Sequence, residues 1–271
     1  MVTFDIGFSQ KKTFKKQMPY KIINSFNIKV ICTVIFFLAS KNSAAQNDSL
    51  NKYGLQVINE VAIYKKNIQQ NAALEMILLK NLIPHLSIEL RYAANNNFLN
   101  QKLYTKLADA YLRKPAAVAL AAIQKELNTK GLGLKIFDAY RPYSITEKIW
   151  EAVKDDRYAA DPKKGSGHNR GIAVDLTIVD LKNNIELNMG TGFDNFTDSA
   201  HHNFILFSKE IIDNRILLKT TMEKYGFAAF DTEWWHYSLP NAINYPLMNI
   251  EFGLLKKIGI VSYPLKGNKN F

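Results

Sequence analysis

Cysteine is almost absent from this 271-residue chain, which has only one, Cys32. It lies in an apolar run near the N-terminus, so the rest of the chain can form neither a disulfide nor a thiolate metal site. Lys29, Val30 and Ile31 precede it, in place of the leucine and small residues of a lipoprotein signal. We therefore interpret Cys32 as a plain apolar residue. A metal in this protein would have to be bound by nitrogen and oxygen ligands.

Long hydrophobic runs are also scarce. The apolar run from Val30 to Ala39 is shorter than the roughly 20 residues that a membrane-spanning helix needs. It follows a lysine-rich stretch and precedes the small residues Ser43-Ala44-Ala45, an order that is typical of a secretory signal peptide. We expect residues 1–45 to be a signal peptide that is cleaved near Ala45, with export to the periplasm. The alternative is an uncleaved N-terminal membrane anchor, and Met18 is an alternative start.

Strong charge of one sign is missing from the expected mature protein. The formal net charge is +11, but the first 45 residues hold seven lysines and one aspartate, so their removal leaves +5. After residue 46 the sequence has no run of Lys and Arg with interleaved aromatic residues, which a nucleic-acid surface would favour. We expect no nucleic-acid partner and no stable membrane span in the mature form. The oligomeric state stays open.

The apolar periodicity predicts both helices and strands. We expect residues 46–84 to be an N-terminal extension with a short helix at 71–82, and residues 85–271 to be the main domain. Strands separated by helices, but joined in places by hairpins, favour a single α+β domain with a central mixed or antiparallel sheet flanked by helices. Helices are predicted at 116–127, directly after Arg141-Pro142 with a capping box at Ser144 and Glu147, and at 208–225; strands are predicted at 86–92, 134–138, 172–179, 185–189 and 233–238.

Two short segments carry a candidate metal site. Ser166 to Asp175 contains His168 and Asp175, and Glu233-Trp-Trp-His236 follows about sixty residues later. Two histidines and one aspartate would give zinc three protein ligands and leave one position for water, as in catalytic zinc sites. His168 is expected in a loop that bends at Gly171, Asp175 on the next strand, and His236 on a neighbouring strand. Glu233 would stand beside the water as the general base.

Further motifs between about Leu90 and Tyr237 carry a family resemblance. These motifs are Arg91-Tyr92-Ala93, Asn97-Phe98, Phe137-Asp138-Ala-Tyr140-Arg141-Pro142, Ser166-Gly-His168, Asp175-Leu-Thr177, Met189-Gly-Thr-Gly-Phe193-Asp194, His201-His202 and Glu233-Trp-Trp-His236-Tyr237. With them the sequence resembles the zinc-dependent D-alanyl-D-alanine dipeptidases of the vancomycin-resistance (VanX-like) type. The resemblance implies a Hedgehog/DD-peptidase-like fold, one Zn²⁺ per chain bound by His168, Asp175 and His236, Glu233 as the catalytic base, and the dipeptide D-Ala-D-Ala as the substrate.

The resemblance also implies roles for residues around the metal. Arg141 would stabilise the tetrahedral intermediate, since a guanidinium presents fixed donors to an oxyanion without changing its protonation. Asp138 would pair with Arg141, either as a purely structural partner or to orient it. Asp194 would meet the free amino terminus of a dipeptide, and Tyr92 and Ser166 its carboxylate end. Such a site would contact both ends of its substrate and so select for the length of a dipeptide.

Two alternatives to a dipeptidase stay open at this stage. One is a D-alanyl-D-alanine carboxypeptidase that removes D-alanine from peptidoglycan stem peptides. The other is a non-catalytic, zinc-stabilised wall-binding module, although the presence of both Glu233 and Arg141 favours an enzyme. His201 and His202 are interpreted as structural residues. The biological role could be wall turnover, peptide salvage or antibiotic resistance.

Overall fold

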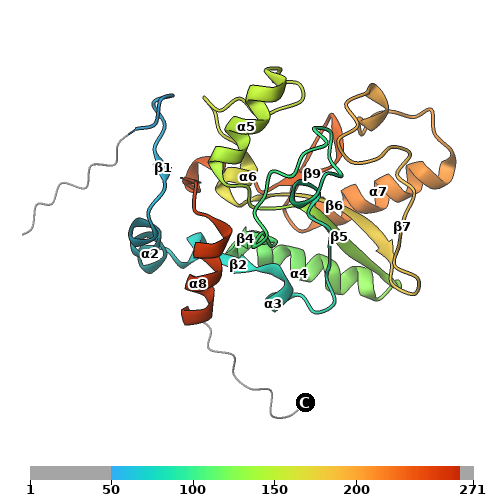
Figure 1. The fold of residues 1–271 in the computed structure, drawn as a ribbon. Helices are drawn as coiled ribbons and strands as arrows, with labels where there is room; N and C mark the ends of the chain where they lie inside the picture. The colour runs from blue at the N-terminus through green and yellow to red at the C-terminus, as the bar shows by residue number, and fades with distance from the viewer. Residues whose placement is uncertain (1–49, 263–271) are drawn as a thin grey trace, which may run out of the picture. The chain divides into compact units, whose positions relative to one another are not determined.

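The computed structural model describes residues 50–262 of the chain (Figure 1). The expected signal peptide or membrane anchor, residues 1–45, lies outside the described residues. Within residues 50–262, no helix is both long enough and apolar enough to cross a membrane. All of the candidate site residues lie inside this range.

A six-stranded sheet lies at the centre of the described fold. Its strands, in spatial order, are β3 (Ser87–Ile88), β5 (Leu132–Asp138), β6 (Ala173–Asp180), β9 (Glu233–Ser238) and β8 (Ala228–Phe230), and β7 (Ile185–Glu186) also pairs with β6. β3 and β5 pair in parallel, whereas the other pairs are antiparallel. The predicted α+β class with a mixed sheet flanked by helices is therefore confirmed.

Two long helices, α4 (Lys114–Asn128) and α7 (Lys209–Lys224), cover one face of this sheet (Figure 1). Val174, Leu176 and Ile178 of β6 are fully buried in the core that these helices share. Side chains alternate across a strand, so Asp175 and Thr177 point to the opposite face. That opposite face carries the candidate site.

Short helices and turns lie between the strands that carry the site. α5 (Tyr143–Val153) and the one-turn helix α6 (Gly167–Arg170) connect β5 to β6. Single 3₁₀ turns lie at Arg91–Ala93 and Asp198–Ala200. These segments carry side chains from distant parts of the sequence to the sheet face that holds the candidate site.

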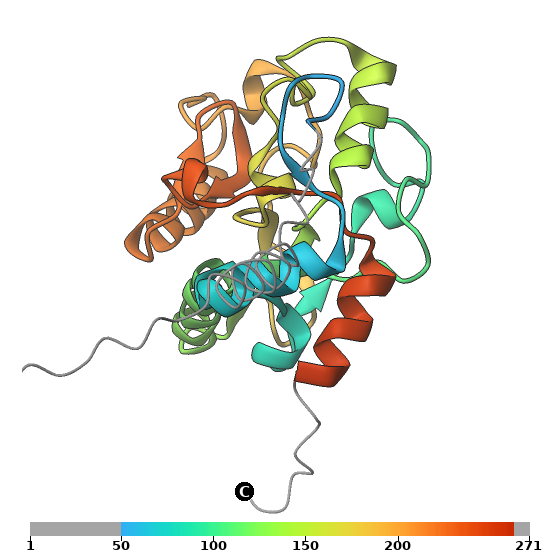
Figure 2. The same cartoon turned by 90° about the vertical axis from the view of Figure 1, so that its left-hand side faces the viewer.

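The segment before β3 packs against the C-terminal part of the chain. β1 (Val57–Ile58) pairs in parallel with β10 (Leu247–Met248), and β2 (Met76–Leu78) pairs antiparallel with β4 (Tyr111–Arg113). Two helices, α2 (Val61–Gln70) and α8 (Phe252–Ser262), both lie on the side that faces the viewer in Figure 2. The expected boundary at residue 84, between an extension and the main domain, stays a prediction.

The prediction of a helix at 71–82 is wrong. In its place the structure has a 3₁₀ turn at Ala72–Leu74, strand β2 and the one-turn helix α3 (Leu79–Leu82). The backbone of β2 pairs with β4, which is more than thirty residues away in the sequence. A long-range pairing of this kind overrides a local helical spacing of apolar residues.

The other predicted elements are found, most of them with shifted ends. The strand predicted at 86–92 is reduced to β3 and is followed by a 3₁₀ turn. α5 begins directly after Pro142, as expected, but Ser144 does not cap it. Ser144 lies in the first turn and its backbone N–H donates to Asn249 Oδ1 at 2.9 Å, while Glu147 pairs with Lys52 at 3.1 Å. Pro142 is the N-cap residue in this helix.

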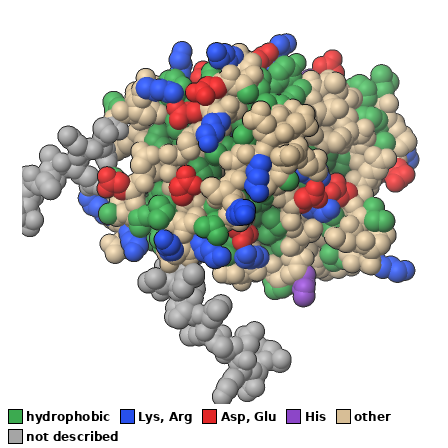
Figure 3. Space-filling view, viewed as in Figure 1, with side chains coloured by type: hydrophobic (Ala, Val, Ile, Leu, Met, Phe, Trp, Pro, Cys, Tyr) green, Lys and Arg blue, Asp and Glu red, His purple; other side chains and the backbone are tan. Residues whose placement is uncertain are grey.

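Basic and acidic side chains are interspersed on the face shown in Figure 3. Several of them form ion pairs, among them Lys135 with Glu186 at 2.9 Å and Lys224 with Glu126 at 2.6 Å. Neighbouring acids therefore neutralise part of the basic charge of the described residues.

Candidate active site

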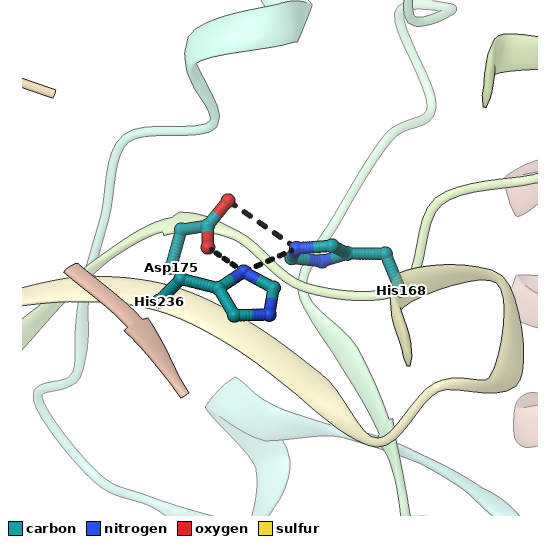
Figure 4. A group of neighbouring side chains, drawn as sticks. All are labelled: His168, Asp175 and His236. Carbon is teal, nitrogen blue, oxygen red and sulfur yellow. Dashed lines mark hydrogen bonds and ion pairs between the residues drawn. The ribbon is translucent and has the colours of Figure 1, made fainter. Parts of the chain in front are cut away.

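Asp175 and His236 are brought together by the pairing of β6 with β9. The two residues are direct partners in the antiparallel register, and Asp175 Oδ1 lies 2.9 Å from His236 Nδ1. His168 approaches from the other side, on α6, and its Nε2 atom points toward both (Figure 4). The predicted position of His236 on a strand next to Asp175 is confirmed.

α6 is held by a capping box that the sequence analysis did not assign to it. Ser166 Oγ accepts a hydrogen bond from the backbone N–H of Asn169, and Asn169 Oδ1 accepts one from the backbone N–H of Ser166. The helix ends at Gly171, which has a φ of 71°. The predicted bend at Gly171 is confirmed. His168, expected in a loop, lies in this one-turn helix.

The three side chains fit the donor set of a zinc site. His168 Nε2 lies 3.3 Å from His236 Nδ1 and 3.4 Å from Asp175 Oδ2. Ligands at about 2.0–2.2 Å from a tetrahedral zinc ion stand about 3.3–3.6 Å from one another, close to these separations. His168 Nδ1 lies 2.7 Å from the carbonyl oxygen of Ala139, which can only accept, so His168 Nδ1 carries the proton. Because Nδ1 is bonded to Ala139, Nε2 is the atom of His168 that is left to bind a cation together with the other two ligands.

Electrostatics keep the aspartate ionised. Burial alone would raise the pKa of Asp175, but the charge of His168 and hydrogen bonds from His168 and His236 hold it below its ordinary value. Burial would lower the pKa of His236, and the hydrogen bond to Asp175 raises it above its ordinary value instead. An ionised carboxylate between two imidazoles is a set of ligands that favours a divalent cation.

Glu233 is the first residue of β9 and lies beside the candidate metal ligands. Its Oε2 atom lies 3.9 Å from His236 Nδ1. Burial raises the pKa of Glu233 above its ordinary value, His236 opposes this and Asp175 adds to it. A raised pKa makes a carboxylate a better acceptor for a proton that it must later return, which suits a general base.

Arg141 is fixed by Asp138. Its Nε and Nη2 atoms donate to Asp138 Oδ2 at 3.0 Å and 2.7 Å, and both side chains are buried. Tyr104 donates to the other carboxylate oxygen of Asp138 at 2.6 Å. Asp138 therefore orients the guanidinium, and Tyr104 orients Asp138. The sequence analysis missed Tyr104, which carries no motif.

Asn169 is a second residue that the sequence analysis missed. It is fully buried, and its amide nitrogen donates to the backbone oxygen of Arg141 at 2.9 Å and to Thr146 Oγ1 at 2.8 Å. Together with its bonds to Ser166, it links the segment that carries His168 to the segment that carries Arg141. The spacing Ser166-x-x-Asn169 was the signal for it, because it is a capping-box spacing.

A cleft of about 190 Å³ brings the candidate residues together. This volume is below the roughly 300–1,000 Å³ of pockets that hold drug-sized ligands, so the cleft suits a short peptide. Asp138 lies behind it, bonded to Arg141, and neither His201 nor His202 lines it. The residues of the sequence-predicted site that line the cleft are Tyr92, Arg141, Ser166, His168, Asp175, Asp194, Glu233 and His236.

Two loops contribute side chains to the wall of this cleft. Residues 156–160, between α5 and α6, line it together with Phe196 from the loop that follows Asp194. The rings of Tyr158 and Phe196 are in contact, with their centroids 4.8 Å apart. At the other side, the hydroxyl of Tyr92 donates to Asp194 Oδ2 at 3.2 Å, and burial raises the pKa of Asp194 well above its ordinary value.

Known proteins resemble this chain over most of its described part. It is 39% identical over 178 residues to the D-alanyl-D-alanine dipeptidase of Escherichia coli (strain K12), covering 66% of this chain and 91% of that protein. It is 28% identical over 182 residues to the D-alanyl-D-alanine dipeptidase of Enterococcus faecalis (strain ATCC 700802 / V583), covering 60% and 90%.

Solved structures resemble it more distantly. The LdcB LD-carboxypeptidase has a TM-score of 0.37 at 18% identity, over 69% of this chain and 73% of that one. The D,D-pentapeptidase VanY from a VanB-type resistance cassette, in complex with Zn(II), has a TM-score of 0.32 at 14% identity, over 60% and 84%. Residues 72–253 match the peptidase M15 family, described as D-ala-D-ala dipeptidase. The chain therefore belongs to this family of hydrolases, as the resemblance of its motifs predicted.

Proposed function

We propose that this protein is a zinc-dependent dipeptidase that hydrolyses D-alanyl-D-alanine. The observation that carries the proposal is the convergence of three metal ligands, a carboxylate with a raised pKa and a fixed guanidinium in one small cleft. Family membership and the names of the related dipeptidases support the same substrate.

His168, Asp175 and His236 would hold one Zn²⁺ per chain. They are three nitrogen and oxygen donors with mutual separations suited to a tetrahedral ion, which leaves room for a fourth ligand. When bound, zinc polarises the substrate carbonyl and lowers the pKa of water at the site.

Glu233 would move the proton. It takes a proton from the attacking water and delivers it to the nitrogen of the leaving D-alanine, so that the scissile C–N bond breaks to an amine. Burial raises the pKa of Glu233, which makes its carboxylate a stronger base for the first of these transfers.

Arg141 would stabilise the charge that develops on the carbonyl oxygen. Burial opposes its charge, but Asp138 more than compensates and holds the pKa of Arg141 well above its ordinary value. The guanidinium is thus always charged and is fixed by two hydrogen bonds to Asp138. A donor fixed before the reaction stabilises an oxyanion without a cost of reorganisation.

The two ends of the dipeptide would be read by different residues. The carboxylate of Asp194 is suited to the substrate's free amino group, and Ser166 to the carboxylate end. The resemblance implied that Tyr92 also meets the carboxylate end. Because Tyr92 donates to Asp194, we assign Tyr92 to the amino end instead.

The site would act outside the cytoplasm. We infer export to the periplasm, with removal of residues 1–45 near Ala45, from the basic, apolar and small-residue order of this segment. Retention as an uncleaved anchor is the alternative. In the periplasm, D-Ala-D-Ala would come from cell-wall peptides, so the role would be in wall turnover or peptide salvage.

A panel of peptides tests this function. Purified protein is assayed on D-Ala-D-Ala, L-Ala-D-Ala, L-Ala-L-Ala and D-Ala-D-Ser, and on a stem pentapeptide that ends in D-Ala-D-Ala, each with zinc and with chelator. We expect the highest kcat/KM on D-Ala-D-Ala, and loss of activity with chelator. Faster release of D-alanine from the pentapeptide would show a carboxypeptidase. No turnover of any of these peptides would favour the wall-binding module.

A further inference from the structure

One loop carries the residue that is proposed to bind the amino end of the substrate. Residues 189–201 lie between β7 and α7, and we call them the Asp194 loop. Asp194 and Phe196 of this loop line the catalytic cleft. From outside the loop, Tyr92 donates a hydrogen bond to Asp194 at 3.2 Å, which is long for a bond between two oxygen atoms. The position of Asp194 therefore depends on how the loop itself is held.

A single buried side chain ties both ends of the Asp194 loop to α7. Arg215 Nε donates to the carbonyl oxygen of Met189, at the start of the loop, at 2.7 Å. At the end of the loop, Nη2 donates to the carbonyl oxygen of Ser199 at 2.9 Å and Nη1 donates to that of His201 at 3.0 Å. One planar guanidinium thus brings together carbonyl groups from both ends of the loop.

The start of the loop is also packed closely. Asn214, the neighbour of Arg215 on α7, donates from Nδ2 to the carbonyl oxygen of Asn188 at 3.0 Å. Gly190 has a φ of 82°, and a Cβ at this position would lie 2.7 Å from the ring of Phe207. The guanidinium of Arg215 lies over the same ring, 4.8 Å from its centroid. The first residues of the loop therefore have little room to move.

The partners of Arg215 suit a geometric role. All three are backbone carbonyl oxygens, which carry no formal charge. Burial lowers the pKa of Arg215 to about 10, so the guanidinium stays charged at neutral pH. A charge that is buried among neutral partners costs stability. An arginine has five N–H donors in a fixed plane, so it can hold several carbonyl groups in one arrangement, which a lysine cannot.

We propose that Arg215 is a positioning residue for substrate recognition. By holding both ends of the Asp194 loop, it fixes the place of the Asp194 carboxylate and so sets the affinity of the site for the free amino group of the substrate. The inference rests on the proposed function, in which Asp194 binds that amino group. A group that is already in place binds more tightly, because less conformational freedom is lost on binding. Arg215 does not line the catalytic cleft, so it acts only through the loop.

Steady-state kinetics of Arg215→Met test this role. Methionine keeps much of the apolar length of the side chain but removes all three donors. We expect KM for D-Ala-D-Ala to rise about tenfold, with kcat within about threefold of the wild type and bound zinc unchanged. Leu218→Ala, a core change on the same helix, is the control for lost stability alone and should leave KM within about twofold. A fall in kcat with unchanged KM would overturn the proposal.

A double-mutant cycle shows whether Arg215 acts through Asp194. Asp194→Asn removes the charge that attracts the amino group, and asparagine tolerates the φ of 58° at this position better than most residues. If Arg215 acts through this carboxylate, Arg215→Met should raise KM by less than about twofold in the Asp194→Asn protein. Effects of the two changes that multiply, as for independent residues, would contradict the proposal.

Hydrogen exchange measures the loop without any substrate. In Arg215→Met we expect the backbone amides of residues 189–201 to exchange about tenfold faster, and those of residues 167–175 to exchange as in the wild type. Arg215→Lys keeps the charge but cannot span the three carbonyl groups, so it should show a smaller change in the same direction, and it replaces Arg215→Met if that protein does not fold.

The exchange experiment also separates this proposal from the proposed function. A folded Arg215 variant with wild-type exchange in the loop and wild-type KM would overturn the proposal while the dipeptidase activity stands. If the wild-type protein does not split D-Ala-D-Ala, the proposed function fails, and the exchange result alone decides whether Arg215 holds the loop.

Discussion

Asp175 and His236 stand opposite each other on β6 and β9, with Asp175 Oδ1 2.9 Å from His236 Nδ1. The backbone pairing of two neighbouring strands thus sets the distance between two of the three proposed metal ligands. The third proposed ligand, His168, reaches them from a one-turn helix that is held at its start by a capping box. The geometry of the site therefore depends on both the strand pairing and the capping box.

Removal of one ligand should abolish metal binding without unfolding the protein. We expect His168→Ala to lower the bound zinc from one per chain to a small fraction. The affinity for zinc should fall by more than the roughly 10–100-fold that is typical when a residue hydrogen-bonded to a metal ligand is removed. Elemental analysis after gel filtration measures it. His201→Ala, a histidine outside the cleft, is the control, and equal zinc loss in both variants would contradict the ligand set.

Glu233→Gln separates proton transfer from metal binding. The amide keeps the shape of the side chain but cannot take a proton, so we expect kcat to fall about 10²–10⁴-fold with zinc content unchanged. Because burial raises the pKa of Glu233, its charge opposes folding at neutral pH, and the variant should be at least as stable as the wild type in urea. Glu223→Gln on α7 is the control. Full activity in Glu233→Gln would refute this mechanism.

Tyr104→Phe tests how the oxyanion donor is fixed. Loss of the hydroxyl leaves one oxygen of Asp138 without its bond, so Arg141 is held less firmly. We expect kcat to fall about tenfold with KM nearly unchanged, and stability to fall by about 1 kcal/mol. Steady-state kinetics and urea unfolding measure both. Tyr225→Phe removes a hydroxyl that bonds to Glu126 away from the site and should leave kcat intact.

His202 should make the stability of the folded protein depend on pH in the mildly acidic range. Burial first, and then the charges of Lys219 and Arg215, lower the pKa of His202 to about 4. An unfolded histidine titrates near about 6.5, so between these values the unfolded chain binds a proton that the folded chain does not. Stability therefore falls as the pH drops from about 6.5 to about 4. Urea unfolding of His202→Gln across this pH range should show a smaller fall in stability than the wild type, and an equal fall would contradict this assignment.

The sequence predicted the residues of the candidate site more accurately than it predicted the bounds of the helices and strands. Glu233–Ser238 forms a strand with the predicted bounds, and Gly171 bends the chain as expected. The helix predicted at 71–82 failed, because β2 pairs with β4 and a local pattern carries no information about so distant a partner. A capping box was assigned to Ser144, whereas the one in the structure joins Ser166 to Asn169.

The sequence by itself determined the donor chemistry of this protein: two histidines, an aspartate, a glutamate and an arginine in motifs specific enough to indicate the family. Only the tertiary structure decided which residues hold these groups in place. Tyr104 and Asn169 act through hydrogen bonds to residues far from them in the sequence. Donor type is a property of each residue, whereas distance and burial are properties of packing.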